Sequence, residues 1–136
     1  MPITGAREPI VPGVAKEMHR DITGIPAGQT LTKVWLVAKE YYSDDDLAAL
    51  FIKAIDTDDV PGVGQITDTG AGDTIGHVRF DIDPDDSINF VPLLEAPYAI
   101  MVETSPGDTH RYLFEEGVFV PSDSVFSSIV LPEPGP

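Results

Sequence analysis

The stretch GHVRFDIDPDDS, residues 76–87, places four aspartates within six positions at the end of an alternating segment. Apolar residues occupy positions 78, 80 and 82, and polar residues occupy the positions between them. Because successive side chains of a β-strand point to opposite faces, this alternation predicts a half-buried strand. Pro84 lacks an N–H and ends the ladder, and the Asp/Ser composition around it is typical of a turn. The stretch therefore favours a strand that runs into a turn.

An EF-hand calcium loop is an alternative interpretation of the same aspartates. Counted from Asp81, Asp83 and Asp85 fall at ligand positions. Asp86 stands where the loop needs glycine, and Pro92 stands where it needs a bidentate glutamate. The count argues against an EF-hand, and we expect no metal and no other cofactor.

Short segments of similar character lie on both sides of this stretch. We expect strands at residues 31–39 and 50–55, and two hairpins. One hairpin joins residues 65–69 to residues 75–82, and the other joins residues 98–104 to residues 110–120. Thirteen prolines and 12 glycines separate these segments and leave little room for long helices. Such a series of short strands predicts a β-sandwich or barrel.

The segment LTKVWLVAK, residues 31–39, is apolar on both faces around positions 34–38, which predicts a central strand between two layers. Trp35 is interpreted as a core residue because tryptophan on a central sandwich strand is usually buried. The alternative is an exposed stacking platform for sugar. The expected core consists of Trp35, Val37, Phe80, Ile82, Ile100 and Val102.

The length of 136 residues suits one domain with a sizeable core. We divide it into an extended Pro/Gly-rich arm at residues 1–20, a sandwich at 21–126 and a Pro-rich tail at 127–136. We expect no transmembrane helix, because the sequence has no long apolar run. We expect no signal peptide, because the N-terminus lacks a basic start followed by an apolar core. The chain has no cysteine, which removes disulfides and thiolate chemistry.

The charge is unevenly distributed along the chain. Eight Lys and Arg against 23 Asp and Glu give a net charge of −15. Residues 1–39 hold five basic and three acidic residues, whereas residues 40–95 hold two basic and 14 acidic ones. We therefore expect neither nucleic acid nor an anionic membrane as a ligand, because both need clustered basic residues. A basic protein surface is the favoured partner.

Signals for catalysis are weak. His19, His77 and His110 lack the spacing of a metal motif, although His77 and His110 are candidates for sharing a metal across a sheet. The serines do not lie in a G-x-S-x-G motif. We therefore expect that the chain is not an enzyme.

The order of several segments resembles that of a known family. The segments are IPAGQTLTKVWLVAK, LFIKAI, GHVRFDIDPDDS and YAIMVETSPGDTHRYLFEEGVFVPSDSV, with a closing strand at 117–121. Over roughly residues 20–126 the chain is similar to the small immunoglobulin-like β-sandwich domains of tailed-phage virions, such as the N-terminal domain of phage baseplate upper proteins. The resemblance implies an immunoglobulin-like antiparallel β-sandwich. It also implies a non-enzymatic structural or adaptor role in the neck, tail, baseplate or fibre-attachment region of a virion made in the bacterial cytoplasm.

The partners expected on this basis are other virion proteins with a basic surface, in multiple copies of a symmetric assembly. The candidate partner-binding residues are Arg7, Ile10, Val11, Tyr41, Tyr42, Asp44, Asp45 and Asp46. The alternative function is a carbohydrate-binding or adhesive module, with calcium at the turn of Asp81 to Asp86 or at Asp44 to Asp46.

Overall fold

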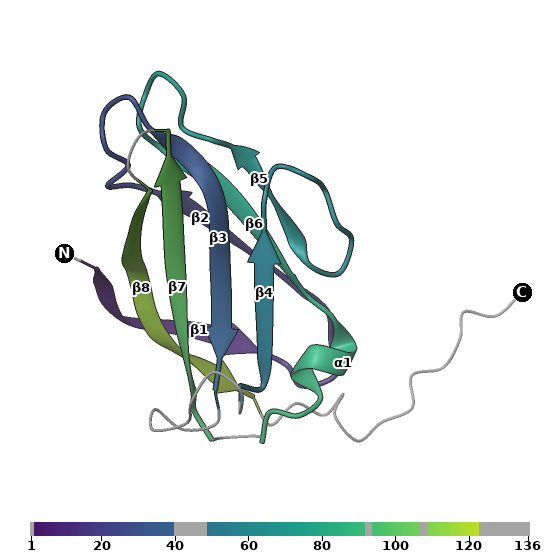
Figure 1. Ribbon diagram of the computed structural model, residues 1–136. Coiled ribbons are helices and arrows are strands. Elements are labelled where there is room, and N and C mark those ends of the chain that lie inside the picture. Colours follow the sequence, from purple (N-terminus) through teal and green to yellow (C-terminus); the bar gives the residue numbers. More distant parts are fainter. Residues whose placement is uncertain (1, 40–48, 92–93, 107–108, 123–136) are drawn as a thin grey trace, which may run out of the picture.

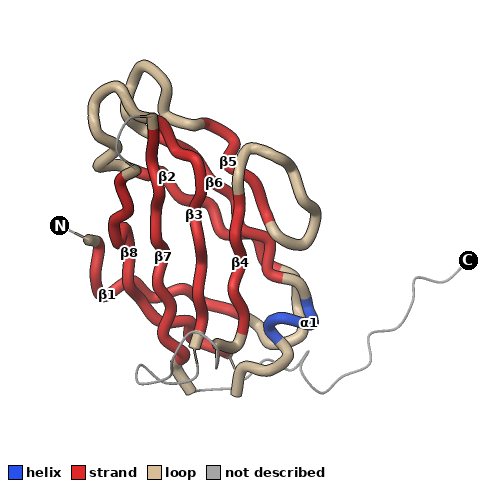
Figure 2. Tube along the Cα trace, viewed as in Figure 1, coloured by secondary structure: helices blue, strands red, loops and turns tan. Residues whose placement is uncertain are grey.

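The computed structural model describes residues 2–39, 49–91, 94–106 and 109–122, and these contain eight strands and one four-residue helix. Figure 2 shows how fully strands dominate the described chain. The elements are β1 (Ile3–Ile10), β2 (Lys16–Ile22), β3 (Thr30–Ala38), β4 (Phe51–Ile55), β5 (Gly64–Asp68), β6 (Gly76–Ile82), α1 (Pro84–Ser87), β7 (Ala96–Ser105) and β8 (His110–Pro121). The prediction of an all-β chain is confirmed.

The strands form two sheets that pack face to face as a sandwich. One sheet has the order β1-β8-β7-β3-β4 and the other has the order β2-β6-β5 (Figure 1). This is an immunoglobulin-like arrangement, in which β3, β7 and β8 take the places of strands C, F and G, and β2, β6 and β5 those of B, E and D. The expected antiparallel pairing needs one correction, because β1 pairs with β8 in parallel.

The two predicted hairpins are both present. β5 pairs with β6, and β7 pairs with β8, each antiparallel. The β7–β8 ladder shifts register between Ile100 and Met101, which marks a bulge on the β8 side. Alternation along β6 buries the apolar positions and leaves the polar positions outside, as the sequence predicted.

The expected arm at residues 1–20 is wrong, because this segment contains β1 and most of β2. β1 forms an edge of the larger sheet, and β2 pairs along its full length with β6. The sequence did not predict either strand because each buries few apolar side chains: Ile10 on β1, and Met18 and Ile22 on β2. The predicted boundary after residue 20 falls inside β2.

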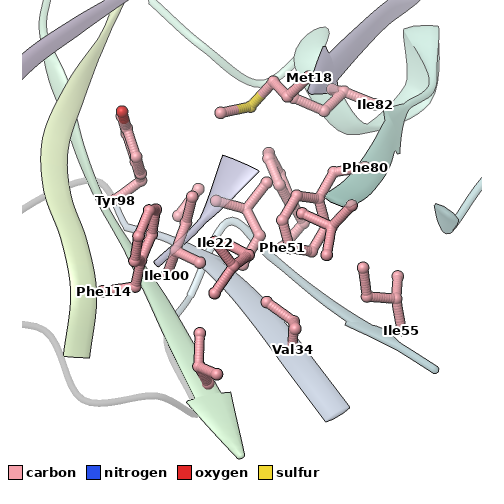
Figure 3. Close-up of a cluster of buried hydrophobic side chains, with 14 of the residues drawn as sticks. Met18, Ile22, Val34, Phe51, Ile55, Phe80, Ile82, Tyr98, Ile100 and Phe114 are labelled. Atoms are coloured by element: carbon pink, nitrogen blue, oxygen red, sulfur yellow. The ribbon is translucent and has the colours of Figure 1, made fainter. Parts of the chain in front are cut away.

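Side chains from the facing surfaces of the two sheets form one hydrophobic core (Figure 3). Phe80, Ile82, Ile100 and Val102 are all buried, as predicted. An aromatic group that the sequence did not predict completes the core: Phe119 lies 4.8 Å from Tyr98, 5.2 Å from Phe90 and 6.0 Å from Phe51, between ring centroids.

The expected core positions of Trp35 and Val37 are wrong. Both side chains are only half-buried, on the outer face of the larger sheet, while Val34 and Leu36 point inward and are fully buried. Because side chains alternate along a strand, only one of the two apolar series of β3 reaches the core. Among the described residues, a second layer packs on one side of this sheet only, so β3 lies inside its sheet, between β7 and β4, but not between two layers.

The turn after β6 is one helical turn, α1. Pro84 occupies its first turn, and the Asp86 carboxylate accepts a hydrogen bond of 2.9 Å from the Asp83 N–H. Asp86 also pairs with Lys53 at 2.6 Å, and this lysine of β4 is buried. The Ser87 hydroxyl accepts a 2.9 Å hydrogen bond from the Gly13 N–H, which fastens α1 to the β1–β2 connection.

Candidate interaction surface

The outer face of the three-stranded sheet is charged. Cross-strand neighbours of β2 and β6 on this face are Glu17 with Asp81, His19 with Arg79, and Asp21 with His77. Such a face interacts well with water, and the residues described on it present no continuous apolar area. It is an open acidic surface with a few internal pairs.

Those pairs hold the main charges of the face in place. The Arg79 guanidinium contacts Asp81 at 2.8 Å and Asp59 at 2.6 Å, and these hydrogen bonds raise the Arg79 pKa. His77 Nδ1 lies 2.7 Å from Asp21 Oδ1. The carboxylates outnumber the cations here, so a negative field remains.

The outer face of the five-stranded sheet is apolar over most of its width. The strand register arranges its outward side chains in two cross-strand rows, each running from β4 over β3 and β7 to β8. The first row is Ala54, Trp35, Met101 and Leu113, and the second is Ile52, Val37, Ala99 and Glu116. We call the seven uncharged members of these rows the apolar band.

The apolar band is accessible to a partner. Ile52 is 48% exposed, and Trp35, Val37, Met101 and Leu113 are half-buried. A depression of about 410 Å³ opens over the band and extends toward Lys39 and Pro97. Contiguous apolar area of this kind on a folded domain is typical of a protein-interaction surface.

A row of charges borders the band toward the β7–β8 turn. Lys33, Glu103 and Arg111 are cross-strand neighbours on β3, β7 and β8. Arg111 Nε donates a 2.8 Å hydrogen bond to Glu103, which lowers the pKa of that carboxyl although desolvation opposes the shift. The Arg111 guanidinium also lies over the Trp35 ring, 5.5 Å from its centroid. Arg111 therefore covers part of the band's only aromatic side chain.

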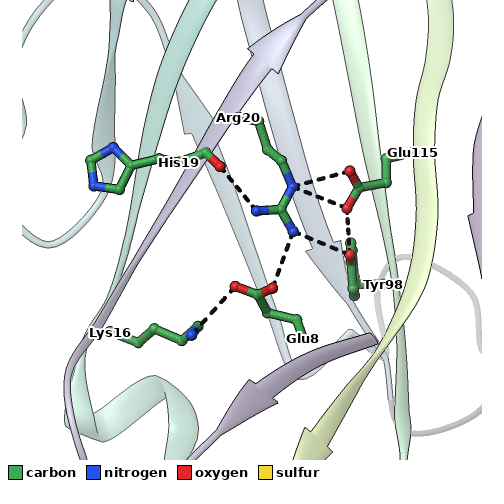
Figure 4. A network of polar contacts seen from close by, with 6 residues as sticks. All are labelled: Glu8, Lys16, His19, Arg20, Tyr98 and Glu115. Atoms are coloured by element: carbon green, nitrogen blue, oxygen red, sulfur yellow. Dashed lines mark hydrogen bonds and ion pairs between the residues drawn. The ribbon is translucent and has the colours of Figure 1, made fainter. Parts of the chain in front are cut away.

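A polar network closes the sandwich where β1 and β8 approach β2 (Figure 4). Arg20 of β2 donates to both carboxylate oxygens of Glu115 at 3.0 and 3.2 Å, and also contacts Glu8 at 3.3 Å. Tyr98 donates a short hydrogen bond to Glu115, and Lys16 pairs with Glu8 at 3.4 Å. The network joins the two sheets at the edge that β1 covers.

Burial affects the ionisation of this network. Desolvation, followed by the hydrogen bond to Glu115, raises the pKa of Tyr98 well above its usual value. Desolvation acts to lower the pKa of Arg20, but hydrogen bonds to Glu115 and Tyr98 outweigh it, so the net shift is upward. Both groups keep their protons at neutral pH, and the arrangement is structural.

The four aspartates of residues 81–86 have separate surroundings. Asp81 pairs with Arg79 and Asp86 with Lys53, while Asp83 and Asp85 are exposed on either side of Pro84. His77 and His110 belong to different sheets. Within the described ranges, no group of three or more His, Asp or Glu side chains is arranged to hold a metal ion.

The structure places the predicted partner-binding residues that it describes in different surroundings. Ile10 is 2% exposed and belongs to the core, so it is not available for a surface contact. Arg7 is exposed and pairs with Glu95 at 2.5 Å, and Val11 lines a shallow hollow of about 290 Å³. The predictions for Tyr41, Tyr42, Asp44, Asp45 and Asp46 lie outside the described residues.

Sequence reasoning missed the apolar band. Its signal was present in residues 34–38, where both alternating series are apolar, but that pattern was interpreted as a strand buried on two sides. Ile52 and Met101 show the same excess of apolar residues on the outer positions of β4 and β7. Within the described residues, a sheet that is covered on one face only and carries apolar residues at these positions presents an exposed apolar surface.

Within the part of the chain that the structure describes, no helix is long and apolar enough to span a membrane. Neither a protein-family model nor a curated protein matches this sequence.

Proposed function

We propose that this chain is a non-enzymatic structural or adaptor protein of a tailed-phage virion, located in the neck, tail, baseplate or fibre-attachment region, where it joins other virion subunits. The observation that carries the proposal is the difference between its two outer faces. One face is apolar and the other is acidic. Two chemically distinct faces on a rigid sandwich suit a part that joins two kinds of neighbour.

The acidic face fits a neighbour with a basic surface. Glu17, Asp21 and Asp81 lie on it, in a chain of net charge −15. Complementary charge speeds association and fixes orientation more than it adds affinity. The apolar band fits a neighbour that excludes water, because removing apolar area from water drives association.

The tailed-phage context is supported by the sequence resemblance over residues 20–126. The immunoglobulin-like strand order is compatible with that resemblance, but many unrelated functions share this architecture.

The direct test uses particles of the phage or prophage that encodes the chain. We expect the chain to co-sediment with purified particles on a density gradient, detected by mass spectrometry. Trp35→Glu, which places a charge in the apolar band, should remain folded and be lost from the particles. Ala71→Glu adds the same charge at an exposed position in the β5–β6 turn, outside both outer faces, and is the matched control. Particles that lack the wild-type chain, or that retain Trp35→Glu in full, would contradict the proposal.

A carbohydrate-binding module is the second candidate, because Trp35 lies on the surface. An exposed indole is a suitable stacking platform for a sugar ring. Arg111 occupies the face of this indole, however, and the apolar band holds no second aromatic residue. Binding to a glycan array that Trp35→Ala abolishes, with no loss from particles, would favour this candidate.

A further inference from the structure

We propose that the apolar band binds a second copy of this chain, giving a two-fold dimer in which the five-stranded sheets pack face to face. This proposal rests on the proposed function in one respect, that the apolar band is a docking surface, and it names the partner. The two-fold axis lies in the interface, parallel to the strands, between β3 and β7. The partner is argued from the register of the outward residues and from their charges.

A two-fold axis in this position keeps each cross-strand row at the same height and exchanges the strands across it. β3 of one copy then faces β7 of the other, and β4 faces β8. Trp35 comes to lie against Met101 of the second copy, a favourable contact between an aromatic ring and a thioether. Val37 meets Ala99, and Ala54 meets Leu113, so large side chains oppose small ones in these two pairs. The fourth pair brings Ile52 against Glu116 and is the one contact between an apolar and a charged side chain.

The same operation places opposite charges together at the border of the band. Lys33 of β3 faces Glu103 of β7 in the second copy, where Glu103 is 9% exposed and also accepts a hydrogen bond from Arg111 of its own chain, and the symmetry repeats the pair. Arg111 of β8 faces the end of β4, where exposed Asp56 follows Ala54 in the outward alternation. A self-complementary row of both signs is what an interface between identical surfaces requires.

The net charge of −15 does not prevent this pairing. The acidic faces lie on the three-stranded sheets, which point away from the interface in both copies. Packed sheets are about 10 Å apart, so four stacked sheets separate the acidic faces by about 30 Å. That separation is several times the Debye length of about 8 Å at physiological ionic strength, so their repulsion is largely screened.

Sedimentation of the purified chain tests the dimer directly. We expect a reversible monomer–dimer equilibrium with a dissociation constant of about 1–100 μM. Trp35 is the chain's single tryptophan and lies in the interface, so its emission should shift to shorter wavelength as the dimer forms. Met101→Glu should weaken the dimer by about 30-fold or more, whereas Ala71→Glu should leave it unchanged.

Charge reversal tests the position of the axis. Lys33→Glu places two carboxylates opposite each other in its own dimer, and Glu103→Lys places two lysines opposite each other. A mixture of the two variants restores opposite charges at both contacts, so we expect each variant alone to be monomeric and the mixture to form a heterodimer. Thermal melting of each variant checks that it is folded, and Lys33→Arg is the charge-preserving control.

Each outcome decides for or against the second copy. Dimerisation with loss in Met101→Glu and recovery in the charge-reversed mixture supports it. A chain that stays monomeric at about 200 μM, or a dimer that Met101→Glu does not affect, overturns it. If Glu103→Lys does not fold, the effects of Met101→Glu and Lys33→Glu still decide. A monomeric chain that nevertheless co-sediments with particles rejects the dimer and keeps the proposed function.

Discussion

Trp35 and Leu36 are adjacent in β3 but experience different surroundings. Leu36 is fully buried between the sheets, and Trp35 lies on the outer face beneath Arg111. We therefore expect Leu36→Ala to cost about 2–5 kcal/mol because it leaves a cavity. Trp35→Ala should cost about 1 kcal/mol and leave the monomer cooperatively folded. Urea unfolding followed by circular dichroism compares the two, and an equal loss would place Trp35 in the core after all.

Glu115 and Glu116 form a similar pair of neighbours on β8. Glu115 is 3% exposed and receives hydrogen bonds from Arg20 and Tyr98, whereas Glu116 is exposed at the end of an outer row. Glu115→Ala should lower the free energy of unfolding by about 3 kcal/mol, since it leaves Arg20 with fewer partners in a partly buried site. Glu116→Ala should change it by less than about 0.5 kcal/mol. Equal values in denaturant titrations would mean that the network in Figure 4 adds nothing to stability.

The raised pKa of Tyr112 predicts how the stability of the fold changes at alkaline pH. Burial raises its pKa to about 12 from the ordinary value near 10, and its hydroxyl donates a 2.8 Å hydrogen bond to the Thr23 carbonyl. Below about pH 10 the tyrosine is protonated in both states, and its full contribution to stability is present. As pH rises from about 10 to 12, the unfolded state loses the proton first, so stability falls. Between about pH 10 and 12, the free energy of unfolding should fall less steeply for Tyr112→Phe than for the wild-type chain. An identical slope would show that Tyr112 does not cause the loss of stability.

At the scale of elements, the sequence predicted strands where alternation was strong. β6 and the β7–β8 hairpin were predicted because apolar residues recur at every second position and turn residues follow. β1 and β2 were missed because an edge strand and a strand on the charged sheet bury too few apolar side chains to give that signal. The orientation of β3 was missed because both of its faces are apolar, and alternation cannot then say which face is covered.

β1 should behave as part of the fold and not as an arm. Its residue Ile10 is 2% exposed, and the Ile10 carbonyl accepts a 2.9 Å hydrogen bond from Ser122 N–H just beyond β8. Ile10→Ala should therefore cost about 2–4 kcal/mol, while Ile3→Ala, at an exposed position of the same strand, should cost little. Amide exchange of the monomer should show protection in the second half of β1. If amides there exchange freely and Ile10→Ala does not change the free energy of unfolding, residues 1–20 are an arm and not part of the fold.

At the scale of the whole molecule, the charge profile of the sequence and the charge of the surface differ. Residues 1–39 carry more basic than acidic residues, but folding places Lys16 and Arg20 against Glu8 and Glu115. Lys33 and Arg111 remain beside the apolar band. The excess of negative charge is visible in the sequence, and the register places three of the described carboxylates, Glu17, Asp21 and Asp81, on the face opposite the band.

This separation of charge predicts opposite effects of salt on the two faces. Raising NaCl from about 10 to 150 mM shortens the Debye length from about 30 to 8 Å, which screens the repulsion within a chain of net charge −15 and between two such chains. The monomer should therefore unfold at a higher temperature, and the dimer formed through the apolar band should tighten. Attachment of the acidic face to a basic neighbour should weaken over the same range, because salt screens that attraction. Thermal melts and sedimentation measure the first two effects, and release of the chain from particles in rising salt measures the third. A dimer that dissociates as salt rises would mean that charge pairs, and not the apolar band, hold the two copies together.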